Sequence, residues 1–337
     1  MPIGKSKAAD SFSDRGKVPV NRFRCACASG TVLIQRRRPV LGNPWVVAVT
    51  AAAAAVLTLW ALTSVAQSPP VSASSGSLGC HAAGVVGEFA HSAVDGQSRP
   101  RTFLVNVPTT YAPSRPYPLV FVFHGSGGDA KQSSSWGLQH APGAAEAAIF
   151  VFPSGIPFQR FGVGWDDRPT GYDLPFFDNM LKSLAAGYCV DLQKVFVAGF
   201  SWGGDFVVML ACQRGDAIRA AAANSSDDEF GNSADYLTYR GLPCPAHRHP
   251  AIRFEHAEGG DASYPAPLFA TTSQLFRFLN QCSAAKQIVP SSSPATSCVA
   301  YSACSSRYVE CTFDKRIGHS LPPNWASETW NFFASFR

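Results

Sequence analysis

The stretch that decides the fold runs from residue 194 to residue 211 and reads KVFVAGFSWGGDFVVMLA. Its first five residues form an apolar run, which is typical of a strand buried on both faces of a parallel sheet. Its last eight residues, from Gly204 onward, have the pattern of a helix. Between them lies a segment that fits the pattern G-x-S-x-G, with Ser201 at its centre. The stretch therefore predicts a strand, a sharp turn and a helix.

The serine of this turn, Ser201, is a candidate nucleophile. A strand-to-helix turn this sharp needs glycine on either side, because side chains would collide there, and it presents the serine in a strained position at the helix N-terminus. The pattern alone is weak, since chance produces it in about one of four chains of this glycine and serine content. The strand before it and the helix after it favour a nucleophile over an incidental serine in a tight turn.

A serine nucleophile requires a base and an acid, and the chain offers candidates for both. Among the histidines after Ser201, we prefer His319, which lies in a loop just before a C-terminal helical pattern, over His247, His249 and His256. The acid is expected between serine and histidine in chain order, after a strand. Asp261 follows the apolar run at residues 251–254, and we prefer it over Glu255, Glu258 and Asp228.

The negative oxygen that forms during acyl transfer needs two backbone N–H donors. Trp202, which follows the candidate nucleophile, is expected to supply one. The loop after the apolar run 119–123 reads HGSGG over residues 124–128, where glycines let the backbone approach a substrate. Ser126 or Gly127 is expected to supply the other donor. The alternative for this loop is a plain glycine-rich turn.

Apolar runs alternate with helical patterns along the rest of the chain. Strands are predicted at residues 102–107, 119–123, 148–152, 194–198 and 251–254, and helices at 142–148, 176–187, 204–213 and 268–281. This alternation predicts an α/β fold, a mostly parallel central sheet flanked by helices.

Charge divides the 337-residue chain into a basic lead and a body close to neutral. Residues 1–44 hold nine basic and two acidic residues, a net charge of +7, so the remainder carries −2 of the total of +5. Uncharged residues 45–66 follow, and residues 1–66 are interpreted as a basic lead plus a signal peptide or, alternatively, an anchor helix. Residues 67–79 are expected to be a disordered linker and 80–337 a single catalytic domain. The near-neutral body argues against binding to nucleic acid.

The cysteines fit an exported protein. Eight of the ten lie in the body, and an even number in an oxidising compartment predicts up to four disulfides without fixing their pairing. A metal site is the alternative, but no Cys-x-x-Cys with matching histidines occurs, so no metal is expected. The cysteines predicted to form disulfides are Cys80, Cys189, Cys212, Cys244, Cys282, Cys298, Cys304 and Cys311.

With these residues laid out, the chain resembles secreted esterases of carbohydrate esterase family one, in the branch of feruloyl esterases and polyhydroxybutyrate depolymerase-like proteins. The resemblance covers nearly all of residues 79–337. It rests on PLVFVFHGSGG at 118–128, GVGWDDRPTG at 162–171, YCVD at 188–191, GFSWGG at 199–204, Gly318-His319 and residues 330–336.

The resemblance implies an α/β-hydrolase that cleaves esters through an acyl-enzyme without a cofactor, with Ser201 and His319 in the family's catalytic positions. The family commonly has His-Gly-x-x-Asp before the acid, whereas this chain is one residue longer between His256 and Asp261. Asp261 is therefore the triad position that departs from the family pattern.

The resemblance leaves the ester open. The first hypothesis is secreted hydrolysis of feruloyl-type esters on plant cell-wall polysaccharide, an oligomeric or polymeric substrate. The alternatives are cleavage of polyhydroxybutyrate oligomers or acetyl esters, or a non-catalytic surface protein with a hydrolase fold. Membrane attachment is expected only through an uncleaved N-terminal segment, and the sequence does not indicate an oligomeric state. The aromatic residues expected to bind substrate are Trp136, Phe158, Phe161, Trp165 and Trp202.

Overall fold

The computed structural model describes residues 76–158, 162–227 and 244–336, all within the compact unit Pro69–Arg337. The lead and signal or anchor predicted at residues 1–66 lie outside the described residues, as do positions 67–75 of the linker. No helix in the described part of the chain combines the length and hydrophobicity that a membrane span requires.

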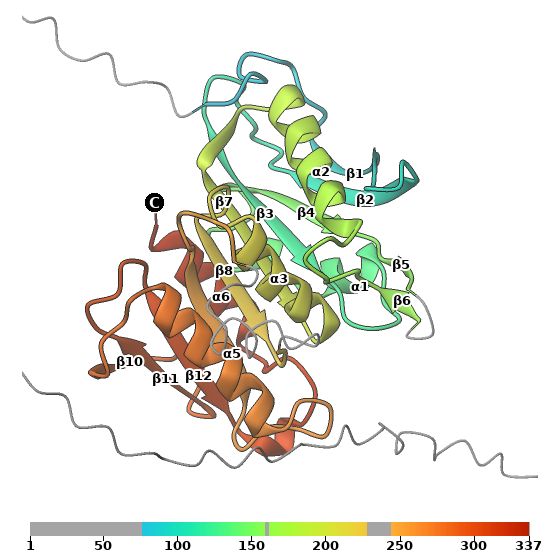
Figure 1. The fold of residues 1–337 in the computed structure, drawn as a ribbon. Coiled ribbons are helices and arrows are strands. Elements are labelled where there is room, and N and C mark those ends of the chain that lie inside the picture. The colour runs from blue at the N-terminus through green and yellow to red at the C-terminus, as the bar shows by residue number, and fades with distance from the viewer. Residues whose placement is uncertain (1–75, 159–161, 228–243, 337) are drawn as a thin grey trace, which may run out of the picture. The chain divides into compact units, whose positions relative to one another are not determined.

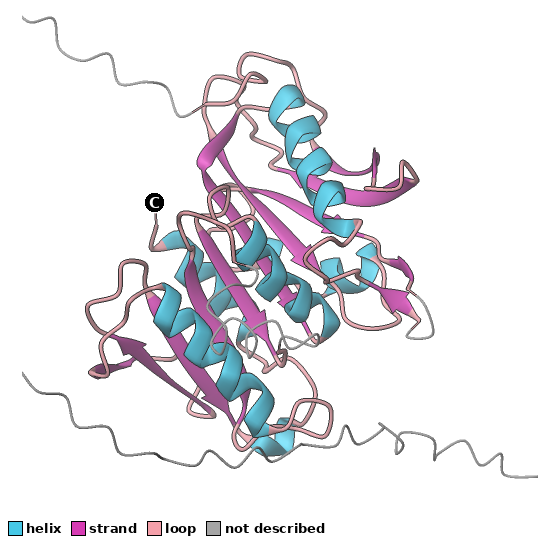
Figure 2. Cartoon of the chain, in the orientation of Figure 1, coloured by secondary structure: helices cyan, strands magenta, loops and turns pink. Residues whose placement is uncertain are grey.

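A ten-stranded sheet forms the centre of the described fold (Figures 1 and 2). The strand order is β1-β2-β4-β3-β7-β8-β9-β12-β11-β10. The six strands from β4 to β12 in this order are parallel, and the two strands at each edge are antiparallel. The strands are β1 (Gly87–Val94), β2 (Pro100–Val107), β3 (Tyr117–Phe123), β4 (Ile149–Pro153), β7 (Val190–Phe200), β8 (Ala220–Asn224), β9 (Ala251–Ala257), β10 (Lys286–Val289), β11 (Thr296–Tyr301) and β12 (Tyr308–Phe313).

Helices cover both faces of this sheet (Figure 1). Alternate residues of β3 belong to two separate apolar clusters. Phe121 and Phe123 pack in the cluster that includes α2, α3 and α5, while Val120 and Val122 pack in the cluster that includes α1 and α6. The helices are α1 (Ala130–Ser135), α2 (Asp173–Gly187), α3 (Trp202–Gln213), α5 (Ala266–Leu279) and α6 (Trp325–Ala334), and β5 (Ile156–Pro157) pairs with β6 (Val163–Gly164) outside the main sheet.

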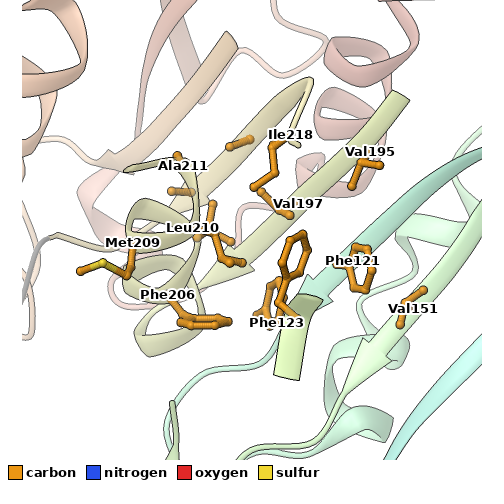
Figure 3. Packing of buried hydrophobic residues seen from close by; sticks show 14 of the residues in the cluster. Phe121, Phe123, Val151, Val195, Val197, Phe206, Met209, Leu210, Ala211 and Ile218 are labelled. Atoms are coloured by element: carbon orange, nitrogen blue, oxygen red, sulfur yellow. The ribbon is translucent and has the colours of Figure 1, made fainter. Parts of the chain in front are cut away.

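Apolar side chains of α3 pack on the central strands (Figure 3). This packing fixes the helix that follows Ser201. Phe206 of α3 meets Phe123 of β3 edge to face, with ring centroids 5.1 Å apart, and both side chains are fully buried. Leu210, one turn further, packs in the same cluster as Val197 of β7. Burial of such a side chain contributes about 1.5–3 kcal/mol. The helix axis is therefore held firmly relative to the strand that precedes Ser201.

The predicted mostly parallel sheet is confirmed, and each of the five predicted strands is present. The helices predicted at 176–187, 204–213 and 268–281 correspond to α2, α3 and α5. The helix predicted at 142–148 is wrong, because Gly143 takes a left-handed conformation with φ of 77° and the segment forms turns instead. Strands β1, β8, β10, β11 and β12 were not predicted.

The prediction of four disulfides is confirmed, and the structure supplies their pairing. Cys80 pairs with Cys189, Cys212 with Cys244, Cys282 with Cys304, and Cys298 with Cys311. The first closes the longest loop, 109 residues, and ties the start of the described chain to the residue before β7. The last joins the adjacent strands β11 and β12.

Candidate active site

Ser201 lies at the junction of β7 and α3 in a strained backbone conformation. Its φ of 56° and ψ of −131° are unusual for a residue other than glycine. The neighbouring chain is packed so tightly that a Cβ at Gly203 would lie 2.2 Å from the carbonyl oxygen of Phe123. A Cβ at Gly199 would lie 2.2 Å from the carbonyl oxygen of Gly203. The two glycines of the G-x-S-x-G pattern are therefore required by the turn itself.

His319 reaches Ser201 from the loop between the short helix η2 (Lys315–Ile317) and α6. Its Nε2 lies 2.8 Å from the Ser201 Oγ, and its Nδ1 lies 3.0 Å from the Asp261 Oδ2. The structure thus brings together the three residues that the sequence singled out. In this arrangement the imidazole can accept the serine proton at Nε2 while Nδ1–H donates to the carboxylate.

Asp261 is held in place by its own loop, four residues beyond the end of β9. Its Oδ1 accepts hydrogen bonds from the backbone N–H of Ser263 at 2.8 Å and of Tyr264 at 2.9 Å, which leaves Oδ2 for His319. The residue by which this chain exceeds the family pattern lies in a turn where Gly259 and Gly260 both have positive φ, 75° and 83°. Glycine adopts this conformation without strain, so the longer loop still delivers the carboxylate to His319.

The other candidates for base and acid lie elsewhere. His256 is buried against Phe269, and His247 is exposed. Glu255 binds Asn224 and Arg253 inside the fold, and exposed Glu258 lines a separate cavity with Asp314. His249 is half-buried near Asp216, while Asp228 lies outside the described residues.

The loop HGSGG lies beside Ser201, and the structure separates its two predicted donors. The N–H of Gly127 already donates to the carbonyl of Val163 at 2.8 Å, so it does not point to the site. Ser126 lines the cleft next to Ser201. Trp202 is the first residue of α3, where backbone N–H groups point beyond the helix N-terminus. We therefore keep Ser126 and Trp202 as the candidate donors.

Hydrogen bonds of the buried His124 side chain fix the conformation of the loop HGSGG (124–128). Its Nε2 accepts a hydrogen bond from the N–H of Gly155 at 2.8 Å, so its Nδ1 carries the proton and donates to the carbonyl of Gly125 at 2.7 Å. The indole N–H of Trp165 donates to the carbonyl of His124 at 2.8 Å. Burial lowers the pKa of His124, which keeps the imidazole neutral.

A cleft of about 290 Å³ opens beside the candidate nucleophile. Its apolar wall comes from Trp136 and Phe200, whose rings meet edge to face with centroids 5.9 Å apart. The other lining residues are Gly125, Ser126, Gln132, Ser201, Ser263 and His319. Of the aromatic residues predicted to bind substrate, only Trp136 is among these lining residues.

The other predicted aromatic residues need correction. Trp165 is fully buried between Phe123 and Phe206, because its indole fills the space under α3. Phe158 and Trp202 are buried too, with ring centroids 6.0 Å apart. The side chains of Trp165, Phe158 and Trp202 therefore form part of the core, and Phe161 lies outside the described residues.

Phe200 was missed by the sequence reasoning, although it directly precedes Ser201 and is the first variable residue of the G-x-S-x-G pattern. Shortly after Trp165, Arg168 donates through Nε and Nη2 to the two carboxylate oxygens of Asp166, at 2.6 and 2.7 Å. In the described part of the chain, no cluster of side chains suited to hold a metal ion occurs.

The fold and this site define the class. The chain has the α/β-hydrolase fold, with the serine, the aspartate and the histidine in the chain order of that fold and at its characteristic strand-to-helix turn. Among solved structures it resembles the acetyl xylan esterase from Aspergillus awamori, with a TM-score of 0.56 and 19% identity. That match covers 73% of this chain and 99% of the other.

The sequence relatives are feruloyl esterases. Feruloyl esterase D from Neurospora crassa is 30% identical over 182 residues, which cover 50% of this chain and 60% of that protein. Feruloyl esterase C from Emericella nidulans is 33% identical over 153 residues, covering 42% of this chain and 53% of that protein. The chain thus spans little more than half the length of these relatives. No family model matches it.

Proposed function

We propose that the protein is a secreted serine carboxylesterase that hydrolyses feruloyl-type esters of plant cell-wall polysaccharide through an acyl-enzyme. The observation that carries the proposal is the unbroken chain of contacts from Ser201 through His319 to Asp261, with distances of 2.8 and 3.0 Å. The likeness to feruloyl esterases supports the substrate class.

In the proposed reaction the Ser201 Oγ attacks the ester carbonyl while His319 takes its proton at Nε2. The negative oxygen that forms is bound by the backbone N–H groups of Ser126 and Trp202, and Asp261 stabilises the imidazolium. His319 then gives its proton to the leaving alcohol. A water molecule, activated by the same imidazole, hydrolyses the acyl-enzyme and restores Ser201. Apart from the water molecule, every group that takes part in catalysis in this proposed reaction belongs to the chain itself.

The cleft supports an aromatic acyl group. Trp136 and Phe200 present apolar ring surface in the cleft that Ser201 also lines, and the acyl part of a substrate is proposed to lie there. Ring contacts of this kind contribute about 0.5–1.5 kcal/mol beyond the burial of apolar area. A methyl or hydroxybutyryl group would leave most of this ring surface uncovered.

Export remains part of the proposal. Four disulfides are expected to persist in an oxidising compartment, and they fit an extracellular protein. A non-catalytic role is disfavoured, because strain at Ser201 and an aligned histidine and aspartate serve no binding function.

A panel of three esters tests the substrate. Purified protein is assayed side by side on methyl ferulate, a hydroxybutyrate oligomer and acetylated xylan. We expect methyl ferulate to give the highest kcat/KM. If the oligomer or the acetylated xylan is cleaved and methyl ferulate is not, the feruloyl assignment is wrong while the serine mechanism stands.

A further inference from the structure

Tyr264 closes the loop that carries the candidate acid. Its backbone N–H donates to the Asp261 Oδ1 at 2.9 Å, and its carbonyl accepts a hydrogen bond from the Asp261 N–H at 3.1 Å. An isolated antiparallel β-bridge between Gly260 and Pro265 encloses the same turn. The position of Tyr264 is thus tied to the position of the carboxylate.

The phenol ring of Tyr264 also contacts the candidate base. It is stacked on the His319 imidazole with ring centroids 5.4 Å apart and an interplanar angle of 25°. The ring of Phe200 is a second neighbour of the imidazole, at 4.8 Å. The His319 side chain is 27% exposed. Its contacts with two aromatic rings restrict the rotation of the imidazole.

The hydroxyl of Tyr264 connects this loop to the helix of the candidate nucleophile. It donates to the Asp205 Oδ2 at 2.6 Å. Asp205 lies in the first turn of α3, is 2% exposed, and donates its backbone N–H to the carbonyl of Ser201 at 3.0 Å. Its other carboxyl oxygen accepts the N–H of Asp227 at 2.8 Å.

The surroundings keep this hydroxyl protonated. Burial and the Asp205 carboxylate raise the pKa of Tyr264 far above its ordinary range. Burial, followed by the neighbouring Asp227 and Asp167, raises the pKa of Asp205. Tyr264 is half-buried and Asp205 is 2% exposed. Loss of this hydrogen bond is costly, because it leaves the buried Asp205 carboxyl without one of its partners.

We propose that Tyr264 is a positioning residue that holds the acid and base of the site in register with the nucleophile. It links Asp261 and His319, which lie on separate loops, to Asp205 on α3, the helix that begins directly after Ser201. The inference rests on the proposed function, since it takes Ser201 as the nucleophile. A displacement of about 1 Å within such an arrangement can lower the rate about a hundredfold.

The variant Tyr264→Phe tests this, because it keeps the ring and the backbone bonds and removes only the hydroxyl. We expect kcat for p-nitrophenyl acetate to fall about tenfold with KM changed less than twofold. The rate at which a fluorophosphonate modifies Ser201 should fall by the same factor, because that reaction needs the serine and its base but no particular ester.

Tyr308→Phe is the matched control. Tyr308 is fully buried on β12, and its hydroxyl donates to the Ser273 Oγ at 2.8 Å. This variant loses the same group and should lose thermal stability, yet keep kcat and the labelling rate. The positioning role is refuted if Tyr264→Phe retains both rates within twofold, or if Tyr308→Phe lowers them equally.

A second variant covers the case in which Tyr264→Phe fails to fold. Asp205→Ala removes the acceptor and should lower kcat and the labelling rate without raising KM, whereas an unchanged kcat refutes the link. Wild-type protein that neither cleaves esters nor reacts with the fluorophosphonate refutes the proposed function together with this inference. Active wild type with an unaffected variant refutes this inference alone.

Discussion

Replacing Asp261 by asparagine exchanges one carboxylate oxygen for an NH₂ group, and the structure indicates how the site responds. The Oδ1 of Asp261 accepts two backbone N–H groups, from Ser263 and Tyr264. The asparagine must therefore keep its amide oxygen there and turn its NH₂ group toward His319. The Nδ1 of His319, 3.0 Å from the other oxygen in the wild type, then has to accept a hydrogen bond instead of donating one.

This change forces the wrong tautomer on His319. With Nδ1 as the acceptor, Nε2 carries the hydrogen and can no longer take the proton of Ser201, 2.8 Å away. Loss of the base in this way lowers kcat by about 10⁴ in a serine–histidine–aspartate site. That factor corresponds to about 5.4 kcal/mol of transition-state stabilisation. Folding should be little affected, because the two backbone bonds to the side chain remain.

Initial rates with p-nitrophenyl acetate and thermal melting curves measure both effects for Asp261→Asn. The control is Glu258→Gln, which removes a nearby carboxylate that lines a separate cavity. We expect the control to keep at least half of the wild-type kcat. A loss of less than tenfold in Asp261→Asn, with the melting temperature unchanged, would refute the tautomer argument and the choice of Asp261.

Two further predictions concern the cleft and the loop beside it. Trp136→Ala should lower kcat/KM for methyl ferulate about five- to tenfold and for p-nitrophenyl acetate less than twofold, because only the aromatic acyl group covers the indole; equal losses on both esters would contradict this. For His124, burial lowers the folded-state pKa below the ordinary 6.5, so the unfolded chain binds the proton first. The free energy of unfolding should therefore fall by up to about 1.4 kcal/mol for each pH unit below 6.5. Urea unfolding at pH 7, 6 and 5 measures this free energy, which should decline less with falling pH in His124→Gln than in the wild type.

The candidate triad that the structure brings together could be predicted because its signals are local. Ser201 lies in a turn that demands glycine on both sides, and His319 and Asp261 each follow from chain order relative to one strand or helix. The extra residue before Asp261 departs from the family pattern, and the length of a loop alone does not show where its carboxylate points. Two successive glycines with positive φ resolve the difference.

The walls of the cleft could not be predicted, because aromatic side chains serve the core and a pocket equally well. Nothing in the sequence around Trp165 (GVGWDDR, 162–168) or Trp136 (SSSWGLQ, 133–139) shows that the first is enclosed beneath α3 and the second lies at the cleft. The strand β8 has the sequence AAAAN, which carries no preference for a strand, and it is extended because β7 and β9 flank it. Both cases depend on tertiary contacts that no local pattern contains.

The role proposed for Tyr264 also depends on tertiary contacts and could not be predicted from the sequence. A tyrosine three residues after an aspartate is unremarkable in a sequence. Only the fold shows that its hydroxyl meets Asp205, 59 positions earlier in the chain.

The central claim is that Ser201 forms the acyl-enzyme, and intact-protein mass spectrometry with peptide mapping tests it most directly. Wild-type protein and Ser201→Ala are each incubated with an alkyl fluorophosphonate and digested. We predict one adduct per wild-type molecule, on the peptide that contains Ser201, and none on the variant, which stays folded and turns over no p-nitrophenyl acetate. An adduct on another residue, or a Ser201→Ala variant that still cleaves the ester, would contradict the account.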